Sequence, residues 1–309
     1  MTVQLLRRTI LLAAVLVSAL PACLAWHQGP MPGEPPAATF VQVRAGDQPI
    51  RVRFRDEGRQ DQPTVVLIHG FASALETWAT VAPRLAQSRR VISLDLKGFG
   101  WTDRPQGDYS PAAQAKMVLA VLQARGVDKF DVVGHSWGSS VALSVALQAP
   151  ERVGKVALYD AWVFEDQLPA FFLWSRVSGV GEALFRLFYK ERADERLAMA
   201  FYDPAVVTEA FVQELNKALD RPGTVAAALA AARGQNYAQI EGDWRKVTQP
   251  VLLLWGREDA VSWLHFGERL AKELPNAQLT VFAHCGHLPM LEAPQASYAA
   301  LAQFLGAQP

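Results

Sequence analysis

The chain has 309 residues, and its 30 Lys and Arg residues balance its 30 Asp and Glu residues, so its formal net charge is zero. Proteins that bind nucleic acid through its phosphates need a basic excess, which excludes that class of partner. Half of the residues are hydrophobic and 19% are charged, a composition that supports a sizeable core and excludes an intrinsically disordered chain. Two cysteines cannot form a disulfide framework, so the fold must rest on its own core.

Residues 1–26 predict a signal peptide or a membrane anchor. Two arginines at positions 7 and 8 precede an apolar run from Ile10 to Leu20, which is the arrangement of a secretory leader. We therefore expect an exported protein, either periplasmic or associated with a membrane through this segment. Three fates of the leader stay open: cleavage, lipidation at Cys23, or retention as an anchor.

Beyond residue 38, predicted strands and helices alternate. Ile50–Arg55 alternates between apolar and polar residues and should form an antiparallel edge with the segment before it. Other strands are short apolar runs, which is typical of parallel strands buried on both faces. These runs are Thr64–His69, Val91–Asp95, Phe130–Gly134, Val153–Tyr159 and Val251–Gly256. Helical patterns cover Thr77–Ala86, Pro111–Arg125, Ser139–Gln148, Leu264–Leu274 and Ala293–Leu305. The alternation predicts an α/β fold, a mostly parallel sheet with helices on both faces.

The same pattern divides the chain into domains. The alternation stops at residues 161–246, where helical stretches rich in aromatic residues predict a helical cap inserted over the sheet. The insertion splits the sheet domain into residues 39–160 and 247–309. Residues 27–38 contain four prolines and two glycines and are predicted to be an extended tether that does not pack.

A candidate nucleophile lies between a predicted strand and a predicted helix. Gly134-His135-Ser136-Trp137-Gly138 has the G-x-S-x-G pattern, in which flanking glycines permit a sharp strand-to-helix turn. Such a turn raises the serine hydroxyl at the carboxyl edge of the sheet, beside a helix N-terminus that favours negative charge. The sequence therefore predicts Ser136 as a nucleophile.

A serine hydroxyl needs a base and a carboxylate that orients the base. Asp259 and His287 follow Ser136 in the chain order serine, acid, histidine, and each comes after a predicted parallel strand. Asp160 and Glu258 remain competing acids. A second histidine, three residues before His287, is interpreted as a structural residue of its loop.

The turn His69-Gly70-Phe71 follows another buried strand and should lie near Ser136. The backbone N–H groups of Phe71 and Trp137 would then supply the two donors of an oxyanion hole.

Together these motifs resemble those of the α/β-hydrolase superfamily over nearly all of residues 39–309. His69-Gly70-Phe71 is similar to the family's oxyanion turn, and Gly134–Gly138 is similar to its nucleophile elbow. Asp259 and His287 match its acid and histidine, and Asp95–Asp103 matches its D-x-x-G-x-G-x-[ST] loop, which makes Asp95 a structural residue. The resemblance implies a sheet of about eight strands and a helical cap inserted after strand six.

The resemblance also bears on the reaction. Serine at position 136 argues against the epoxide hydrolases and haloalkane dehalogenases of this superfamily, which use aspartate. We expect a serine esterase that forms an acyl-enzyme and needs neither cofactor nor metal. Aromatic residues in 161–246 favour a small apolar ester as substrate. The alternatives are a carbon–carbon bond hydrolase, a cofactor-free haloperoxidase, an acyltransferase on the same triad, or a binding module without turnover. Acyl chain length and oligomeric state stay open.

Overall fold

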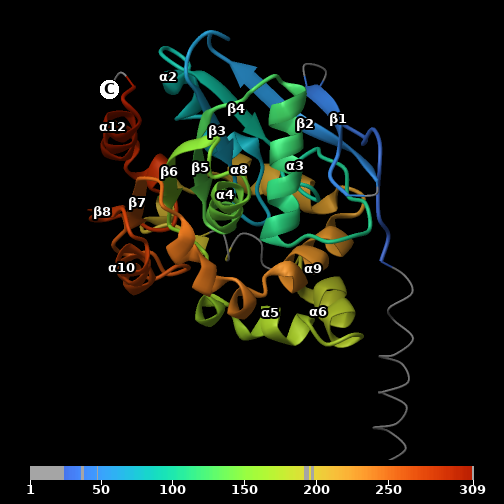
Figure 1. Ribbon diagram of the computed structural model, residues 1–309. Coiled ribbons are helices and arrows are strands. Elements are labelled where there is room, and N and C mark those ends of the chain that lie inside the picture. The colour runs from blue at the N-terminus through green and yellow to red at the C-terminus, as the bar shows by residue number, and fades with distance from the viewer. Residues whose placement is uncertain (1–23, 36–37, 47, 191–194, 196–197, 308–309) are drawn as a thin grey trace, which may run out of the picture.

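An eight-stranded sheet forms the centre of the molecule (Figure 1). The computed structural model describes residues 24–35, 38–46, 48–190, 195 and 198–307. The strands are β1 (Thr39–Arg44), β2 (Pro49–Glu57), β3 (Thr64–Ile68), β4 (Arg90–Leu94), β5 (Phe130–His135), β6 (Val153–Tyr159), β7 (Val251–Gly256) and β8 (Ala277–Phe282). Their order in the sheet is β1-β2-β4-β3-β5-β6-β7-β8. The pairs β1–β2 and β2–β4 are antiparallel and all other pairs are parallel, which confirms the predicted antiparallel edge.

Helices cover both faces of the sheet, as predicted. Along β3, Val66 and Ile68 join a core cluster that includes residues of α3 and α4, whereas Val65 and Leu67 join another that includes residues of α2 and α12. Successive side chains of a strand point to opposite faces, so a strand buried in both clusters has to be apolar throughout. The α-helices are α2 (Ala82–Leu85), α3 (Pro111–Ala124), α4 (Trp137–Gln148), α5 (Ala170–Ser175), α6 (Val180–Phe188), α8 (Glu209–Asp220), α9 (Thr224–Gly234), α10 (Leu264–Glu273), α11 (Pro289–Glu292) and α12 (Pro294–Leu305). The 3-10 helices are η2 (Leu75–Trp78), η3 (Glu165–Gln167), η4 (Pro204–Val206), η5 (Tyr237–Gln239) and η6 (Glu241–Lys246).

One predicted helix, Thr77–Ala86, is wrong as a single element. The structure has η2 followed by the short helix α2 in its place. Pro83 lies in the first turn of α2. Proline has no backbone N–H and disfavours helical backbone at the preceding residue, so it is tolerated at a helix start and not in a helix interior. The chain therefore begins a new helix here.

The predicted tether is packed over part of its length. His27 and Arg104 exchange backbone hydrogen bonds of 3.1 and 2.7 Å. Glu34 forms a salt bridge of 2.7 Å with Arg51 of β2. Residues 27–34 thus lie against the sheet domain, which differs from the free tether that the Pro and Gly content predicted.

The predicted leader falls almost entirely on residues 1–23, outside the described part of the chain. Within the described part, no helix combines the length and the apolarity needed to cross a membrane.

Helices α5, α6, α8 and α9 follow β6 in the chain, where the helical insertion was predicted. Figure 1 shows α5, α6 and α9 together at the lower side of the molecule. Phe185 and Tyr189 form a small core with residues of α8 and α9, and Phe71 from the turn after β3 packs against it. The inserted helices therefore contact the region of the predicted oxyanion turn. Their action as a cap over a substrate stays a prediction.

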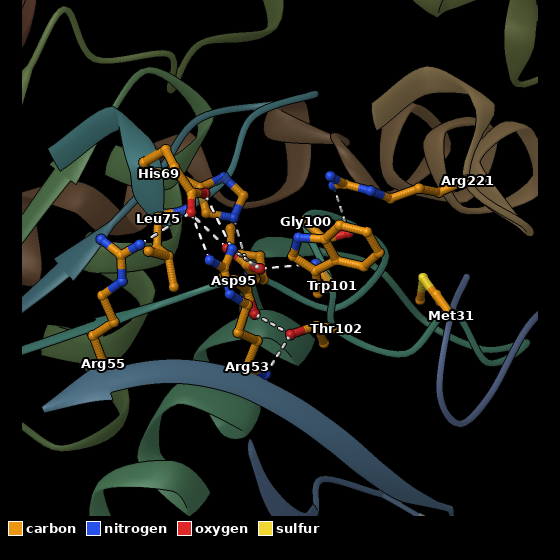
Figure 2. A network of polar contacts seen from close by, with 12 residues as sticks. Met31, Arg53, Arg55, His69, Leu75, Asp95, Gly100, Trp101, Thr102 and Arg221 are labelled. Atoms are coloured by element: carbon orange, nitrogen blue, oxygen red, sulfur yellow. Dashed lines mark hydrogen bonds and ion pairs between the residues drawn. The ribbon is translucent and has the colours of Figure 1, made fainter. Parts of the chain in front are cut away.

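Asp95 ties together the loops at the carboxyl end of β4. Its carboxylate accepts hydrogen bonds of 2.8 Å from the N–H groups of Leu75 and Trp101, and it forms an ion pair of 3.3 Å with Arg53. The hydroxyl of Thr102 donates to the Asp95 carbonyl oxygen at 2.8 Å. Figure 2 shows these groups converging on Asp95 from three segments of the chain. The predicted structural role of Asp95 agrees with these contacts.

We expect Asp95→Ala to lower the free energy of unfolding by about 3–5 kcal/mol, because it leaves two buried N–H groups without their acceptor and removes one of the two carboxylates that pair with the buried guanidinium of Arg53. Denaturant titration followed by circular dichroism measures the change. Asp61→Ala, which removes a fully exposed carboxylate from a surface pair with Arg59, is the control and should leave the unfolding midpoint unchanged. Equal midpoints for the two variants would contradict the role given to Asp95.

Candidate active site

Ser136 occupies the turn between β5 and α4. Its backbone has φ 52° and ψ −124°, an uncommon conformation for a residue with a side chain. A Cβ on Gly134 would lie 2.5 Å from the Gly138 carbonyl oxygen, and a Cβ on Gly138 would lie 2.4 Å from the His69 carbonyl oxygen. Only glycine fits at either position, so the two glycines permit the strained turn that presents the Ser136 hydroxyl.

The turn after β3 lies directly against Ser136, the predicted nucleophile. A Cβ on Gly70 would be 3.0 Å from the Ser136 Cβ, so the two segments are in close contact. Within the described residues, the backbone N–H groups of Phe71 and Trp137 have no hydrogen-bond acceptor. Unpaired donors on the two segments that flank Ser136 are what an oxyanion hole requires. Their action in catalysis stays a prediction.

The structure brings Asp259 and His287 together. Nδ1 of His287 and Oδ2 of Asp259 are 2.7 Å apart, and both side chains are buried. The other carboxylate oxygen, Oδ1, accepts hydrogen bonds from the N–H groups of Val261 and Ser262, at 2.7 and 2.9 Å. These two donors hold the carboxylate, which in turn fixes the imidazole with Nδ1 protonated and Nε2 available as a base.

The competing residues have other contacts. Glu258 accepts a hydrogen bond of 3.1 Å from the Cys285 N–H, and Cys285 is a buried free thiol. His284 lies in an exposed loop with φ 56°, within 3.1 Å of the Tyr202 hydroxyl. Asp160 is buried at the end of β6 and accepts a hydrogen bond of 2.8 Å from the Gly256 N–H.

His135, which the sequence analysis did not single out, supports the base. Its Nε2–H donates to the backbone carbonyl oxygen of His287 at 2.8 Å, and the centres of the two rings are 4.9 Å apart. Complete burial, with the nearby His287 ring, lowers the pKa of His135 to about 3, so the ring is neutral at physiological pH. Its position in the G-x-S-x-G pattern, directly before Ser136, was the available signal.

Asp160, Asp259 and His287 also resemble a metal site, because one potential ligand atom from each lies within 4.8 Å of the others. Their hydrogen bonds argue for a triad instead. Both Asp259 oxygens already accept from N–H groups, and Nδ1 of His287 is turned toward Asp259. A metal ion would have to displace these donors.

Aromatic rings surround Phe71 beside the nucleophile. Its ring centre is 5.4 Å from that of Phe99 and 6.0 Å from that of Trp137 in α4. From the inserted helices, Phe172 and Tyr189 approach to 5.2 and 6.3 Å. The surroundings of the predicted oxyanion turn are therefore apolar on the side of the insertion, which suits an apolar substituent on a substrate.

The sequence and the fold are similar to those of known hydrolases. The sequence profile of a family described as "alpha/beta hydrolase fold" matches residues 63–294. The chain is 31% identical over 260 residues to 2-hydroxy-6-oxo-2,4-heptadienoate hydrolase of Pseudomonas putida, covering 79% of this chain and 89% of that protein. It is 32% identical over 253 residues to 2-hydroxymuconate semialdehyde hydrolase of Pseudomonas putida, covering 78% and 86%. A solved structure of a meta-cleavage product hydrolase from Pseudomonas fluorescens superimposes with a TM-score of 0.73 at 25% identity, covering 86% of this chain and 97% of that chain.

Proposed function

The chain belongs to the α/β-hydrolase family, and on that premise we propose that it hydrolyses a carbon–carbon bond beside a ketone, in a substrate of the 2-hydroxy-6-oxo-dienoate class. The observation that carries the proposal is the identity above 30% to two hydrolases whose names give substrates of that kind. The arrangement of Ser136 beside the turn after β3, with the bonded pair Asp259 and His287, supports it. The relatives favour this alternative over the ester hydrolysis that the sequence alone predicted.

In the proposed reaction, His287 takes the proton of Ser136 as the hydroxyl oxygen bonds to the ketone carbon at position 6. The N–H groups of Phe71 and Trp137 stabilise the negative charge that forms on the ketone oxygen. When the carbonyl reforms, the bond between carbons 5 and 6 breaks. The step requires the 2,6-dioxo-3-ene tautomer of the substrate, formed when the 2-hydroxyl group loses its proton and carbon 5 gains one. From the saturated carbon 5 the electron pair is delocalised through the double bond onto the 2-oxo group, and the resulting dienolate takes up the proton from His287. Water, activated by the same histidine, then hydrolyses the acyl ester on Ser136, and one water is consumed overall.

Hydrolysis of a carboxylic ester is the second candidate. The rings of Phe172 and Tyr189 beside Phe71 are compatible with it, because they suit an apolar acyl group whether its carbonyl is bonded to oxygen or to carbon. The same triad and the same oxyanion donors would serve both reactions, and they differ only in the leaving group.

A substrate comparison separates the two candidates. We expect kcat/KM for 2-hydroxy-6-oxo-2,4-heptadienoate, followed by the loss of its visible absorbance, to exceed kcat/KM for p-nitrophenyl acetate, butyrate and octanoate by about 100-fold or more. The opposite order would contradict carbon–carbon bond cleavage and support the esterase. A faster reaction on adding an alcohol acceptor would indicate acyl transfer. Inertness to every substrate and to a fluorophosphonate would indicate a binding module.

A further inference from the structure

Asp160 is a buried acidic residue that the proposed reaction does not use. It follows β6 directly, its side chain is inaccessible to solvent, and its backbone has φ 42°. Oδ1 accepts a hydrogen bond of 2.8 Å from the Gly256 N–H at the end of β7. No N–H group of the described residues reaches Oδ2. An ionised carboxylate oxygen that is buried without a hydrogen-bond donor lowers the stability of the folded protein. The protonation state of Asp160 is therefore the question.

The neighbour of Asp160 is the acid of the proposed triad. An oxygen of Asp160, an oxygen of Asp259 and a ring nitrogen of His287 all lie within 4.8 Å of one another. Hydrogen bonding with Asp259 is among the causes that raise the pKa of Asp160. Two carboxylates in contact inside a protein cannot both stay ionised, because burial and mutual repulsion each favour the neutral form of one of them. We therefore expect one of the two groups to be protonated.

The hydrogen bonds show which residue carries the charge. Asp259 accepts from the N–H groups of Val261 and Ser262 and lies 2.7 Å from Nδ1 of His287. Asp160 accepts from one N–H group, that of Gly256. A carboxylate is stabilised by each donor it accepts from, so the negative charge belongs on Asp259 and the proton on Asp160.

We propose that Asp160 is a positioning residue, a neutral carboxylic acid whose Oδ2–H donates a hydrogen bond to the Asp259 carboxylate and so holds the acid that orients His287. The proposal rests on the proposed catalytic roles of Asp259 and His287. In it, Oδ2 becomes a donor to the carboxylate, and Asp259 gains a partner beyond the N–H groups of its own loop.

The electrostatic surroundings agree with a protonated Asp160. Burial, and next the charge of Asp259, raise the pKa of Asp160 well above its usual range. The other titratable groups near it are His287, Tyr159 at the end of β6, Cys285 after β8, and Glu292 in α11. Of these only His287 can be a cation, and only while it holds an additional proton.

Asp160→Asn tests the protonation state. The amide keeps both contacts, because its NH₂ group can donate to Asp259 and its oxygen can accept from Gly256, and the charge of the site does not change. We measure the rate of Ser136 labelling by a fluorophosphonate from about pH 4 to about pH 9, which reports the base without requiring the natural substrate. We expect a rate within about threefold of the wild type and an acid-limb midpoint within about 0.3 pH unit. A larger shift toward lower pH would overturn the proposal, because it would mean that an anion stabilising the protonated imidazole had been removed.

Asp160→Ala tests the hydrogen bond. Without the donor, Asp259 is held less firmly and retains more negative charge, which stabilises the protonated imidazole. We expect labelling to slow by about tenfold and the acid limb to move to higher pH. A profile equal to the wild type would overturn the proposal, since the hydrogen bond would then have no effect. If Asp160→Ala does not fold, the Asn variant decides the question.

Infrared spectroscopy gives a readout that does not depend on activity. At neutral pH, the difference spectrum between the wild type and Asp160→Asn should contain the C=O stretch of a protonated carboxyl group. A carboxylate band in its place would overturn the proposal. Because this measurement and the fluorophosphonate rates need no substrate, failure of the proposed carbon–carbon bond hydrolysis would leave the test of Asp160 intact.

Discussion

Ser136→Ala should lower kcat/KM for any substrate of this protein by about 10⁴-fold or more. The variant lacks the oxygen that bonds to the substrate carbonyl, and a triad without its nucleophile loses most of its rate enhancement. Steady-state kinetics with the dienoate and with p-nitrophenyl esters measure the effect. A fluorophosphonate, which labels an activated serine, should label the wild type and leave the variant unlabelled.

Ser139→Ala is the matched control for this variant. Ser139 lies in the first turn of α4, directly after the turn that holds Ser136. It is also buried, and its hydroxyl has no hydrogen-bond partner in the described structure. The substitution therefore removes a buried hydroxyl close to the site without touching the reacting groups, and activity should be unchanged. If both variants lost activity alike, the loss would come from disturbance of α4, and the nucleophile would have to be sought elsewhere.

Asp259→Asn should lower kcat by about 10⁴-fold. The amide oxygen can still accept from Val261 and Ser262, so the loop keeps its shape. The NH₂ group would then face Nδ1 of His287 and turn it into an acceptor, which places the ring proton on Nε2. In that tautomer His287 cannot take the proton of Ser136. The kcat should fall at every pH at which the protein is folded.

The adjacent acid provides the control for Asp259→Asn. Glu258→Gln keeps an oxygen that can accept from the Cys285 N–H, and Glu258 has no contact with His287 in the described structure. This variant should retain activity within about threefold of the wild type. An active Asp259→Asn together with an inactive Glu258→Gln would assign the acid of the triad to Glu258.

Local features of the sequence predicted most of the sheet and the turn that presents Ser136. Nearly continuous apolar runs identified β6 and β7 with the bounds that the structure has, because a parallel strand covered on both faces is apolar over most of its length. The turn at Ser136 was predictable because it requires glycines at fixed positions before and after the serine. Both glycines stand within five consecutive residues of the sequence. Helix bounds were less predictable. Helix α4 begins at Trp137, two residues before its predicted start, because the turn at Ser136 leads directly into helical backbone.

By itself, the sequence determined the order of strands and helices, the elbow at Ser136, and a short set of acids and histidines at strand ends. Only the tertiary structure showed which of these acids contacts which histidine. Asp160 and Asp259 both follow strands that end at the same sheet edge, and spacing along the chain does not say which carboxylate reaches His287. The N–H groups of Val261 and Ser262 orient Asp259, and these contacts depend on the path of the loop. The packing of residues 27–34 likewise depends on partners that are distant in sequence, which local composition does not report.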